Sequence, residues 1–259
     1  MENGIILQTQ NLRKDFGGLV AVDDVSLNVR AHSLHSIIGP NGAGKTTLFN
    51  LLSGNLRPSS GTVRYKGQDI TETPAHRRTH MGIGRSFQIT NLFPNLSVLE
   101  NVRLAAQALG RDNFKFWRHH RHFGIYEERA REAISQVGLV NQINQPARVL
   151  SHGDQRKLEL TILLAADPET LLLDEPTAGM AREEIPRLME IIEEIRRQGN
   201  KTILLVEHKM DLVMNVSDRI SVMHQGRLLA EGTPGEISAN EIVQSAYLGD
   251  LYGDFSEVR

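Results

Sequence analysis

Residues 39–47 read GPNGAGKTT and fit the spacing G-x-x-x-x-G-K-[S/T]. The apolar run LHSIIG, residues 34–39, precedes this stretch, and the pattern GKTTLFNLLSG, residues 44–54, is typical of a helix. Glycines placed between a buried strand and a helix allow backbone N–H groups to close around phosphate oxygens. The stretch therefore predicts a nucleotide-binding protein. Its phosphate loop would consist of Gly39, Pro40, Asn41, Gly42, Ala43, Gly44, Lys45, Thr46 and Thr47.

Four residues, two of the loop and two beyond it, carry the chemistry that nucleotide binding and hydrolysis need. Lys45 is expected to neutralise β- and γ-phosphate oxygens, and the Thr46 hydroxyl to bind Mg²⁺. The run TLLLDE, residues 170–175, predicts a buried strand that ends on two carboxylates. Ligands bind at the carboxyl ends of parallel strands, so Asp174 would hold Mg²⁺ and Glu175 would orient or deprotonate an attacking water. The sequence thus predicts Mg²⁺ as the cofactor.

The order of strand and helix patterns indicates an α/β fold with a mostly parallel sheet and an antiparallel β layer, as in phosphate-loop NTPases. Period-2 patterning at residues 5–12 and 20–30 predicts the antiparallel layer. Residues 90–167 are mostly helical in character, and strand patterns return at 170–175, 201–208 and 219–232. We expect one domain over 5–249. Its core would comprise 5–89 and 168–249, with a helical insertion over 90–167 and a short C-terminal tail over 250–259.

The composition narrows the class of protein. The chain has 259 residues, of which 40% are hydrophobic, and a formal net charge of −2, so we expect no nucleic-acid partner. It has no cysteine, which excludes disulfides, zinc thiolate sites and cysteine nucleophiles. The start MENGIILQTQ lacks the pattern of a signal peptide, and no apolar run approaches the roughly 20 residues of a membrane span. We expect a cytoplasmic protein that reaches a membrane only through a partner.

A second helix start lies far from the phosphate loop, in LSHGDQRKLEL at residues 150–160. Ser151 is a natural N-cap and Gly153 leaves the backbone bare, so N–H groups would point at an anion in front of the helix. The pattern alone does not say whose phosphate this helix faces.

Two other segments have plainer interpretations. The stretch 182–199 predicts a packing helix with Ile185, Leu188, Ile192 and Ile195 on one face. The Arg/His-rich stretch 114–123 is interpreted as a solvated loop or docking surface, with a metal site as the alternative.

Four motifs occur in one order: GPNGAGKTT, LSHGDQ at 150–155, LLLDEP at 171–176 and VEHKMD at 206–211. With them the chain resembles the ATP-binding subunits of ABC transporters over roughly residues 5–249. The resemblance implies a head-to-tail dimer with a second ATPase subunit, the same or a related chain. Ser151, Gly153 and Asp154 would then contact the ATP held by that partner.

The resemblance also implies other partners and a location. The partners would be transmembrane permease subunits and, indirectly, a solute-binding protein. The chain would lie at the cytoplasmic face of the inner (plasma) membrane.

The resemblance assigns roles to four more residues. Phe16 would stack on adenine, with plain packing as the alternative, and Val22 would flank the base. Gln88 would sense Mg²⁺ and the attacking water and touch the permease. His208 would contact the γ-phosphate and position the catalytic carboxylate of Glu175. The implied metal site consists of Thr46, Gln88 and Asp174.

Three residues depart from the family pattern. His152 and Asp154 replace a glycine and the glutamine of the usual LSGGQ. Asp154 can still accept hydrogen bonds from ribose hydroxyls, so we expect a working variant, with an inactive signature as the alternative. Ala181 stands where aspartate is usual, which removes a side-chain contact across the dimer.

Within the family, four segments look most like the ATPases of branched-chain amino-acid importers: residues 16–27, 82–102, 206–234 and 246–249. The function expected is therefore ATP hydrolysis that drives import of branched-chain or similar amino acids. The alternatives are an ABC-type ATPase of a soluble assembly, a transporter of another solute, and a nucleotide-gated regulatory module that hydrolyses little. A small-molecule kinase is disfavoured because it would need neither LSHGDQ nor His208.

Overall fold

The computed structural model describes residues 4–86, 92–108 and 123–252, with the backbone alone at Phe123 and 247–252. Gln88 and residues 114–122 of the Arg/His-rich stretch lie outside the described residues. The strands are β1 (Ile5–Phe16), β2 (Leu19–Val25), β3 (Asn28–Arg30), β4 (Leu34–Ile38), β5 (Ser60–Tyr65), β6 (Gln68–Asp69), β7 (Ile83–Arg85), β8 (Thr170–Asp174), β9 (Thr202–Val206), β10 (Arg219–His224) and β11 (Arg227–Gly232). The helices are α1 (Lys45–Ser53), α2 (Ala75–His80), α3 (Val98–Ala108), α4 (Phe123–Val137), α5 (His152–Ala165), α6 (Ile185–Arg197), α7 (Met210–Val216), α8 (Pro234–Ser238) and α9 (Glu241–Tyr252), with 3-10 turns η3 (Val140–Gln142) and η4 (Ala147–Val149).

Two sheets form the core of the fold. One has the order β2-β1-β5-β6, with β3 also paired to β1, and its pairs are antiparallel. The other has the order β11-β10-β4-β9-β8-β7, and its pairs are parallel except for β10 with β11. The α/β prediction with an antiparallel layer is confirmed. The predicted strand pattern over 219–232 is a hairpin of two strands, β10 and β11.

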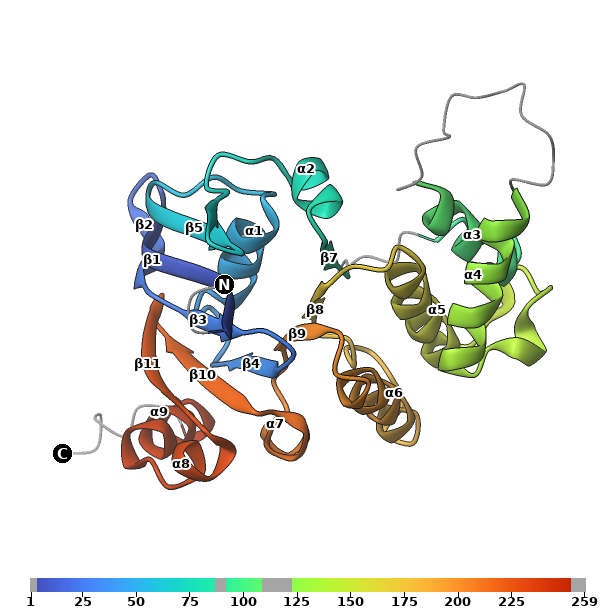
Figure 1. Cartoon of the computed structure of the whole chain (residues 1–259). Coiled ribbons are helices and arrows are strands. Elements are labelled where there is room, and N and C mark those ends of the chain that lie inside the picture. Colours follow the sequence, from blue (N-terminus) through green and yellow to red (C-terminus); the bar gives the residue numbers. More distant parts are fainter. Residues whose placement is uncertain (1–3, 87–91, 109–122, 253–259) are drawn as a thin grey trace.

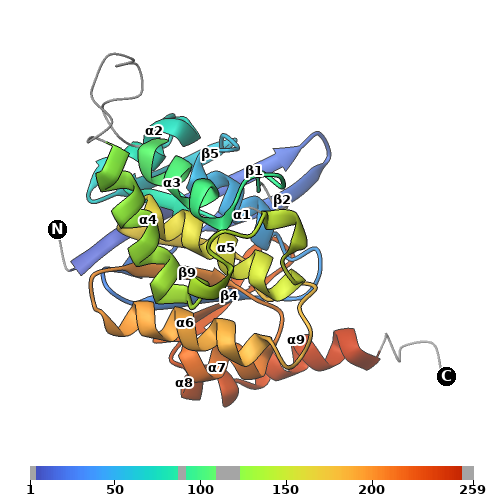
Figure 2. The ribbon, with the colours of Figure 1, turned by 90° about the vertical axis from the view of Figure 1, so that its right-hand side faces the viewer.

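The mostly parallel sheet is covered on both faces, as such sheets require. Alternate residues of its strands serve different cores: Leu172 and Leu204 pack with α1 and the antiparallel layer, whereas Leu171, Leu173 and Leu205 pack with the helices. Figure 1 shows α1 beside the antiparallel strands and α3, α4 and α5 gathered on the far side of the molecule. Figure 2 shows α4, α5 and α6 crossing in front of the sheet.

Most predicted helices are confirmed, including the helical character of the insertion. The four apolar residues predicted for the packing helix are all buried in α6, and Pro186 lies in its first turn. The predicted C-terminal tail begins too early, because α9 continues to Tyr252 rather than ending before residue 250. This helix starts at a strong cap, in which Asn240 Oδ1 accepts the backbone N–H groups of Ile242 and Val243.

A buried arginine fixes the C-terminal end of α1. Arg78 is 1% exposed, and its guanidinium donates to the carbonyl oxygens of Leu51 and Leu52, at 2.7 and 2.8 Å, and to carbonyls near α2. These bonds satisfy carbonyls that a helix end leaves without partners. Helix α1 is therefore held at its far end while its start carries the phosphate loop.

A buried histidine sits in the central strand β4. Nε2 of His35 lies 2.8 Å from Ser221 Oγ, and Glu231 and Arg219 are the charged groups nearby. Burial lowers the pKa of His35 to about 4, against the attraction of Glu231. The folded protein therefore keeps this ring neutral at pH values where an unfolded chain would protonate it.

We predict that the free energy of unfolding falls by about 2 kcal/mol between pH 7 and pH 5 on account of His35. The sign follows because the unfolded chain takes up a proton below about pH 6.5, whereas the folded protein does so only near pH 4. Urea unfolding of the wild type and of His35→Asn at both pH values measures this. In His35→Asn the fall in the free energy of unfolding between the two pH values should be smaller by that amount. The control is His32→Asn, a change at an exposed histidine, in which the full fall should persist. An unchanged drop in His35→Asn would contradict the assignment.

Candidate active site

The phosphate loop connects β4 to α1, as the sequence predicts. Its backbone has positive φ at Gly39 (154°), Gly42 (79°) and Gly44 (97°). A Cβ on Gly39 would collide with the carbonyl oxygen of Met223, and one on Gly44 with that of Ala21. Strands β10 and β2 therefore press on the loop from two sides, and only glycine fits at these positions.

The side chain of Lys45 turns back into this loop. Nζ of Lys45 donates to the carbonyl oxygens of Gly39 at 2.6 Å and Pro40 at 2.8 Å. Burial lowers the pKa of Lys45, and the nearby carboxylates of Glu175 and Asp174 act in the opposite direction. The ammonium group of Lys45 thus lies inside the loop, where it interacts electrostatically with the carboxylates of both predicted acidic residues.

Asp174 ends the buried strand β8 and is itself buried. Its Oδ2 accepts from Arg85 Nη2 at 2.9 Å, and its backbone N–H donates to Ser86 Oγ at 3.1 Å. Burial raises the pKa of Asp174, and Arg85 opposes this rise. Its Oδ1 is buried and has no hydrogen-bond partner among the described residues. A buried carboxylate oxygen left open beside the phosphate loop fits a hard cation such as Mg²⁺.

Glu175 and His208 meet at the edge of the sheet. Nε2 of His208 lies 2.6 Å from Glu175 Oε1, and both side chains are partly exposed. Glu175 has φ of 49°, a left-handed conformation that is uncommon for a residue with a side chain and that often occurs at functional sites. The structure therefore brings together Glu175, the predicted base, and His208, which the resemblance implied would position it.

Glu207 is a buried carboxylate of this site that no sequence motif singled out. It is 2% exposed, its Oε1 accepts from the backbone N–H of Thr177 at 3.0 Å, and its Oε2 from that of His208 at 3.3 Å. One buried carboxylate thus holds the segment after Glu175 and the backbone of His208. The only signal in the sequence was an acidic residue at the end of an apolar strand.

The second predicted helix start is confirmed as the start of α5, and its role as an anion site stays a prediction. Ser151 is the N-cap and its side chain accepts from the backbone N–H of Asp154 at 3.1 Å. The carboxylate of Asp154 pairs with Lys157 at 2.9 Å, and His152 packs against Gly179. Within the described ranges no hydrogen bond or ion pair joins 151–154 to 39–47. Figure 1 shows α5 apart from α1, the helix that follows the phosphate loop of the same chain.

The two residues predicted to contact adenine differ in exposure. Phe16 ends β1 and is 48% exposed, with Lys14 Nζ 5.2 Å from its ring centroid, so its exposure is compatible with stacking on a base. Val22 is fully buried in the core between the sheets, because successive side chains of β2 point to opposite faces. This burial weighs against a direct contact between Val22 and a base, and it is the backbone carbonyl of the preceding residue, Ala21, that lies beside Gly44 of the loop.

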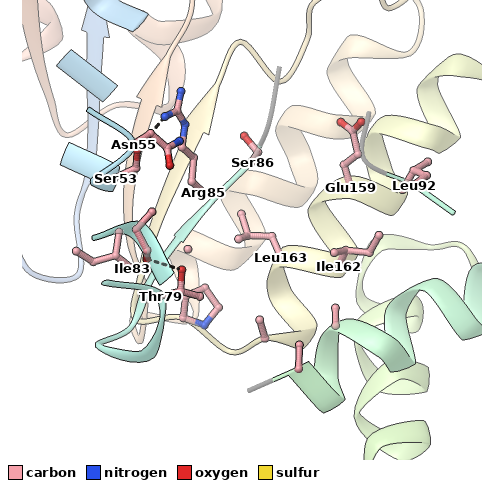
Figure 3. Close-up of a pocket in the computed structure, with 16 residues that line it drawn as sticks. Ser53, Asn55, Thr79, Ile83, Arg85, Ser86, Leu92, Glu159, Ile162 and Leu163 are labelled. Carbon is pink, nitrogen blue, oxygen red and sulfur yellow. Dashed lines mark hydrogen bonds between the residues drawn. The ribbon is translucent and has the colours of Figure 1, made fainter. Parts of the chain in front are cut away.

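A groove of about 380 Å³ separates the sheet core from the helical insertion (Figure 3). Ser53, Ile83 and Arg85 lie on one wall, and Ile162 and Leu163 of α5 lie on the other. Most of its lining is apolar, and Glu159 lies at one end. Arg85 is therefore shared between this groove and the Asp174 carboxylate.

Comparison with known proteins decides the family. The profile described as "ABC transporter" matches residues 22–178. The chain belongs to the ABC transporter ATP-binding family. A second profile, "Branched-chain amino acid ATP-binding cassette transporter", matches residues 227–251 of this ABC ATPase. As in the rest of the family, its enzymatic activity is ATP hydrolysis.

Two named relatives are similar over nearly their whole length. The high-affinity branched-chain amino acid transport ATP-binding protein LivG of Salmonella typhimurium is 42% identical over 250 residues, which is 95% of this chain and 98% of that protein. The corresponding protein BraF of Pseudomonas aeruginosa is 40% identical over 253 residues, with coverage of 95% and 98%.

Solved structures agree with the ABC ATPase fold. The ADP conformation of the cassette MJ1267 has a TM-score of 0.81 at 29% identity, covering 95% of this chain and 99% of that one. The bacterial cassette MJ0796, solved as a dimer, has a TM-score of 0.77 at 25% identity, with coverage of 88% and 99%. Over the described ranges of the ABC ATPase, no helix has the length and apolar content of a bilayer span.

We predict that Gly44→Ala in this ABC ATPase weakens ATP binding about tenfold or more, because the methyl group meets the Ala21 carbonyl and φ is positive. Titration with a fluorescent ATP analogue measures the effect. The control is Gly67→Ala, where φ is also positive (80°) but nothing lies within 4 Å of the added Cβ. Equal affinities in the two variants would contradict the close approach at Gly44.

Proposed function

We propose that this chain is the ATP-hydrolysing subunit of an importer of branched-chain amino acids. It would lie at the cytoplasmic face of the inner membrane, bound to transmembrane permease subunits that a solute-binding protein serves. The names of LivG and BraF support this cargo, as does the matching C-terminal profile over 227–251. The observation that carries the hydrolytic function is the 2.6 Å contact between His208 and Glu175 beside the phosphate loop.

In the proposed mechanism the chain binds and orients the nucleotide first. The ring of Phe16 stacks on adenine, the backbone of the phosphate loop surrounds the phosphates, and Lys45 exchanges its carbonyl partners for phosphate oxygens. Glu175 then orients or deprotonates the attacking water, while His208 holds that carboxylate and contacts the γ-phosphate.

The proposed cofactor is Mg²⁺, held by Asp174, the Thr46 hydroxyl and Gln88. The support from the described residues is the open Oδ1 of Asp174, which lies beside the loop that carries Thr46. When bound, the ion would offset negative charge that develops on the phosphate oxygens. Within the described residues, no group of three His, Cys, Asp or Glu side chains is placed to hold a metal ion, and a site completed by a hydroxyl and phosphate oxygens requires none.

The proposed partner at the nucleotide is a second ATPase subunit, the same or a related chain. The support is the separation of the α5 start from the phosphate loop in one chain, together with the dimer of MJ0796. Ser151, Gly153 and Asp154 would cover the nucleotide of the other subunit. Because Lys157 already holds the Asp154 carboxylate, its bonds to ribose would be shared with that lysine.

The proposed docking site of a permease is the groove between the sheet core and α5. It is mostly apolar, and its lining includes Ser86 and Leu92. A cytoplasmic element of a membrane subunit that fills this groove would touch Arg85 and α5 together, so that movement of the helical insertion reaches the membrane.

We predict that Glu175→Gln lowers steady-state ATP hydrolysis by roughly 10²–10⁴-fold, because the amide cannot accept the proton of the attacking water. ATP binding should stay close to that of the wild type. Phosphate release and binding of a fluorescent ATP analogue measure the two effects separately. A variant that retains most of its turnover would refute the role given to Glu175.

We predict that Ile162→Glu abolishes ATP-dependent uptake of labelled leucine, isoleucine and valine by cells that depend on this chain, because the carboxylate places a charge in the apolar groove. Hydrolysis by the isolated subunit should be retained. The control is Val140→Glu, on an exposed position of the same insertion. Normal uptake with Ile162→Glu would argue against docking in the groove. Wild-type cells that take up none of the three amino acids would point to another cargo.

A further inference from the structure

Arg85 joins three parts of the molecule through one side chain. It is the last residue of β7, and its side chain is 10% exposed. Nη1 donates to Asn50 Oδ1 at 2.6 Å and to Ser53 Oγ at 2.8 Å, both on α1. Nη2 donates to Asp174 Oδ2 at 2.9 Å, at the end of β8. The guanidinium is therefore a rigid bridge between the helix of the phosphate loop and the acidic strand end.

The two carboxylate oxygens of Asp174 have different environments because Arg85 bonds only one of them. Oδ2 is held by Arg85, whereas Oδ1 is buried without a partner among the described residues. Ser86, the next residue, fixes the backbone N–H of Asp174 as well. A carboxylate that is fixed through one oxygen and open at the other presents one oxygen, in a defined orientation, to a metal ion.

The helix that anchors Arg85 also carries the other ligand. Thr46 lies in the first turn of α1, and Asn50 and Ser53 lie one and two turns further along. The distance between Thr46 and Asp174 thus depends on two elements that Arg85 holds together. A planar guanidinium with several donors can make these three bonds at once, whereas a lysine ammonium on a flexible stem lacks this fork.

We propose that Arg85 is a positioning residue, which fixes Asp174 against α1 so that the free carboxylate oxygen and the Thr46 hydroxyl form one metal site. The proposal rests on the Mg²⁺ site of the proposed function and adds the residue that assembles it. Arg85 acts through Asp174 and does not itself contact nucleotide or metal.

The test measures metal binding directly, in the isolated full-length subunit. Mn²⁺ is titrated in the presence of a non-hydrolysable ATP analogue and followed by electron paramagnetic resonance. We expect Arg85→Gln to weaken Mn²⁺ binding by about tenfold to a hundredfold, the usual range for a lost partner of a metal ligand. Affinity for the analogue in EDTA should stay within about twofold of the wild type, because the phosphate loop is intact.

Three further variants separate positioning from general damage. Asn50→Ala keeps the Arg85 charge but removes one anchor, so its Mn²⁺ affinity should fall in the same direction and by less. Arg85→Lys should recover only part of the loss. Arg156→Gln is the matched control, since Arg156 lines a small cavity with Asp174 but pairs with Glu159 at 2.8 Å. It should bind Mn²⁺ as the wild type does.

Several results would overturn the proposal. Wild-type or tighter Mn²⁺ binding by Arg85→Gln would show that the arginine is dispensable or competes with the metal. Full recovery by Arg85→Lys would show that charge alone suffices. These results do not depend on any permease, so a failure here is distinct from a failure of the transport function, which only the uptake experiment tests.

Discussion

The parallel register of β4, β9 and β8 is the constraint on which the site depends. Ile37 pairs with Val206 of β9, and Asp174 of β8 pairs with the same residue from the other side. Parallel strands in register end at one edge, so the residues that follow them gather there. The phosphate loop follows β4, Glu207 and His208 follow β9, and Asp174 and Glu175 end β8. Segments more than 160 residues apart in the chain thereby form one site.

The buried polar residues refine what the strand ends bring together. Glu207 ties the backbone of His208 to that of Thr177, and Arg85 ties Asp174 to α1. Glu207 is 2% exposed and the Arg85 side chain 10% exposed, and the hydrogen bonds that each makes offset part of the cost of burying its charge. Arg85 also lines the groove, so this one side chain connects the groove wall to Asp174 at the end of β8.

Much of this arrangement could be predicted from the sequence, because its signals are local. The phosphate loop, the acidic strand end of β8 and the Ser151 cap are each written within a few consecutive residues, and the structure forms all three. Their order along the chain identified the family. Helix α6 could be predicted in the same way, since its apolar residues repeat with the helical period.

The parts that could not be predicted depend on contacts between distant segments. Nothing in the sequence around Gly44 reveals the Ala21 carbonyl that makes glycine obligatory there. Arg85, Glu207 and Arg78 look like ordinary surface charges until the fold buries them. The role of Val22 at the base was assigned by resemblance to the family. Its burial depends on the face of β2 on which its side chain lies, and a shift of one residue along a strand moves a side chain to the opposite face.

The central claim is that the nucleotide site is completed by the α5 start of a second subunit. It is tested most directly by the solution mass of the Glu175→Gln protein with and without Mg-ATP. Slow hydrolysis in this variant would preserve the bound nucleotide, so the account predicts a monomer without ATP and a dimer with it. A protein that binds Mg-ATP at saturation and remains a monomer would contradict a site completed by a second copy of this chain.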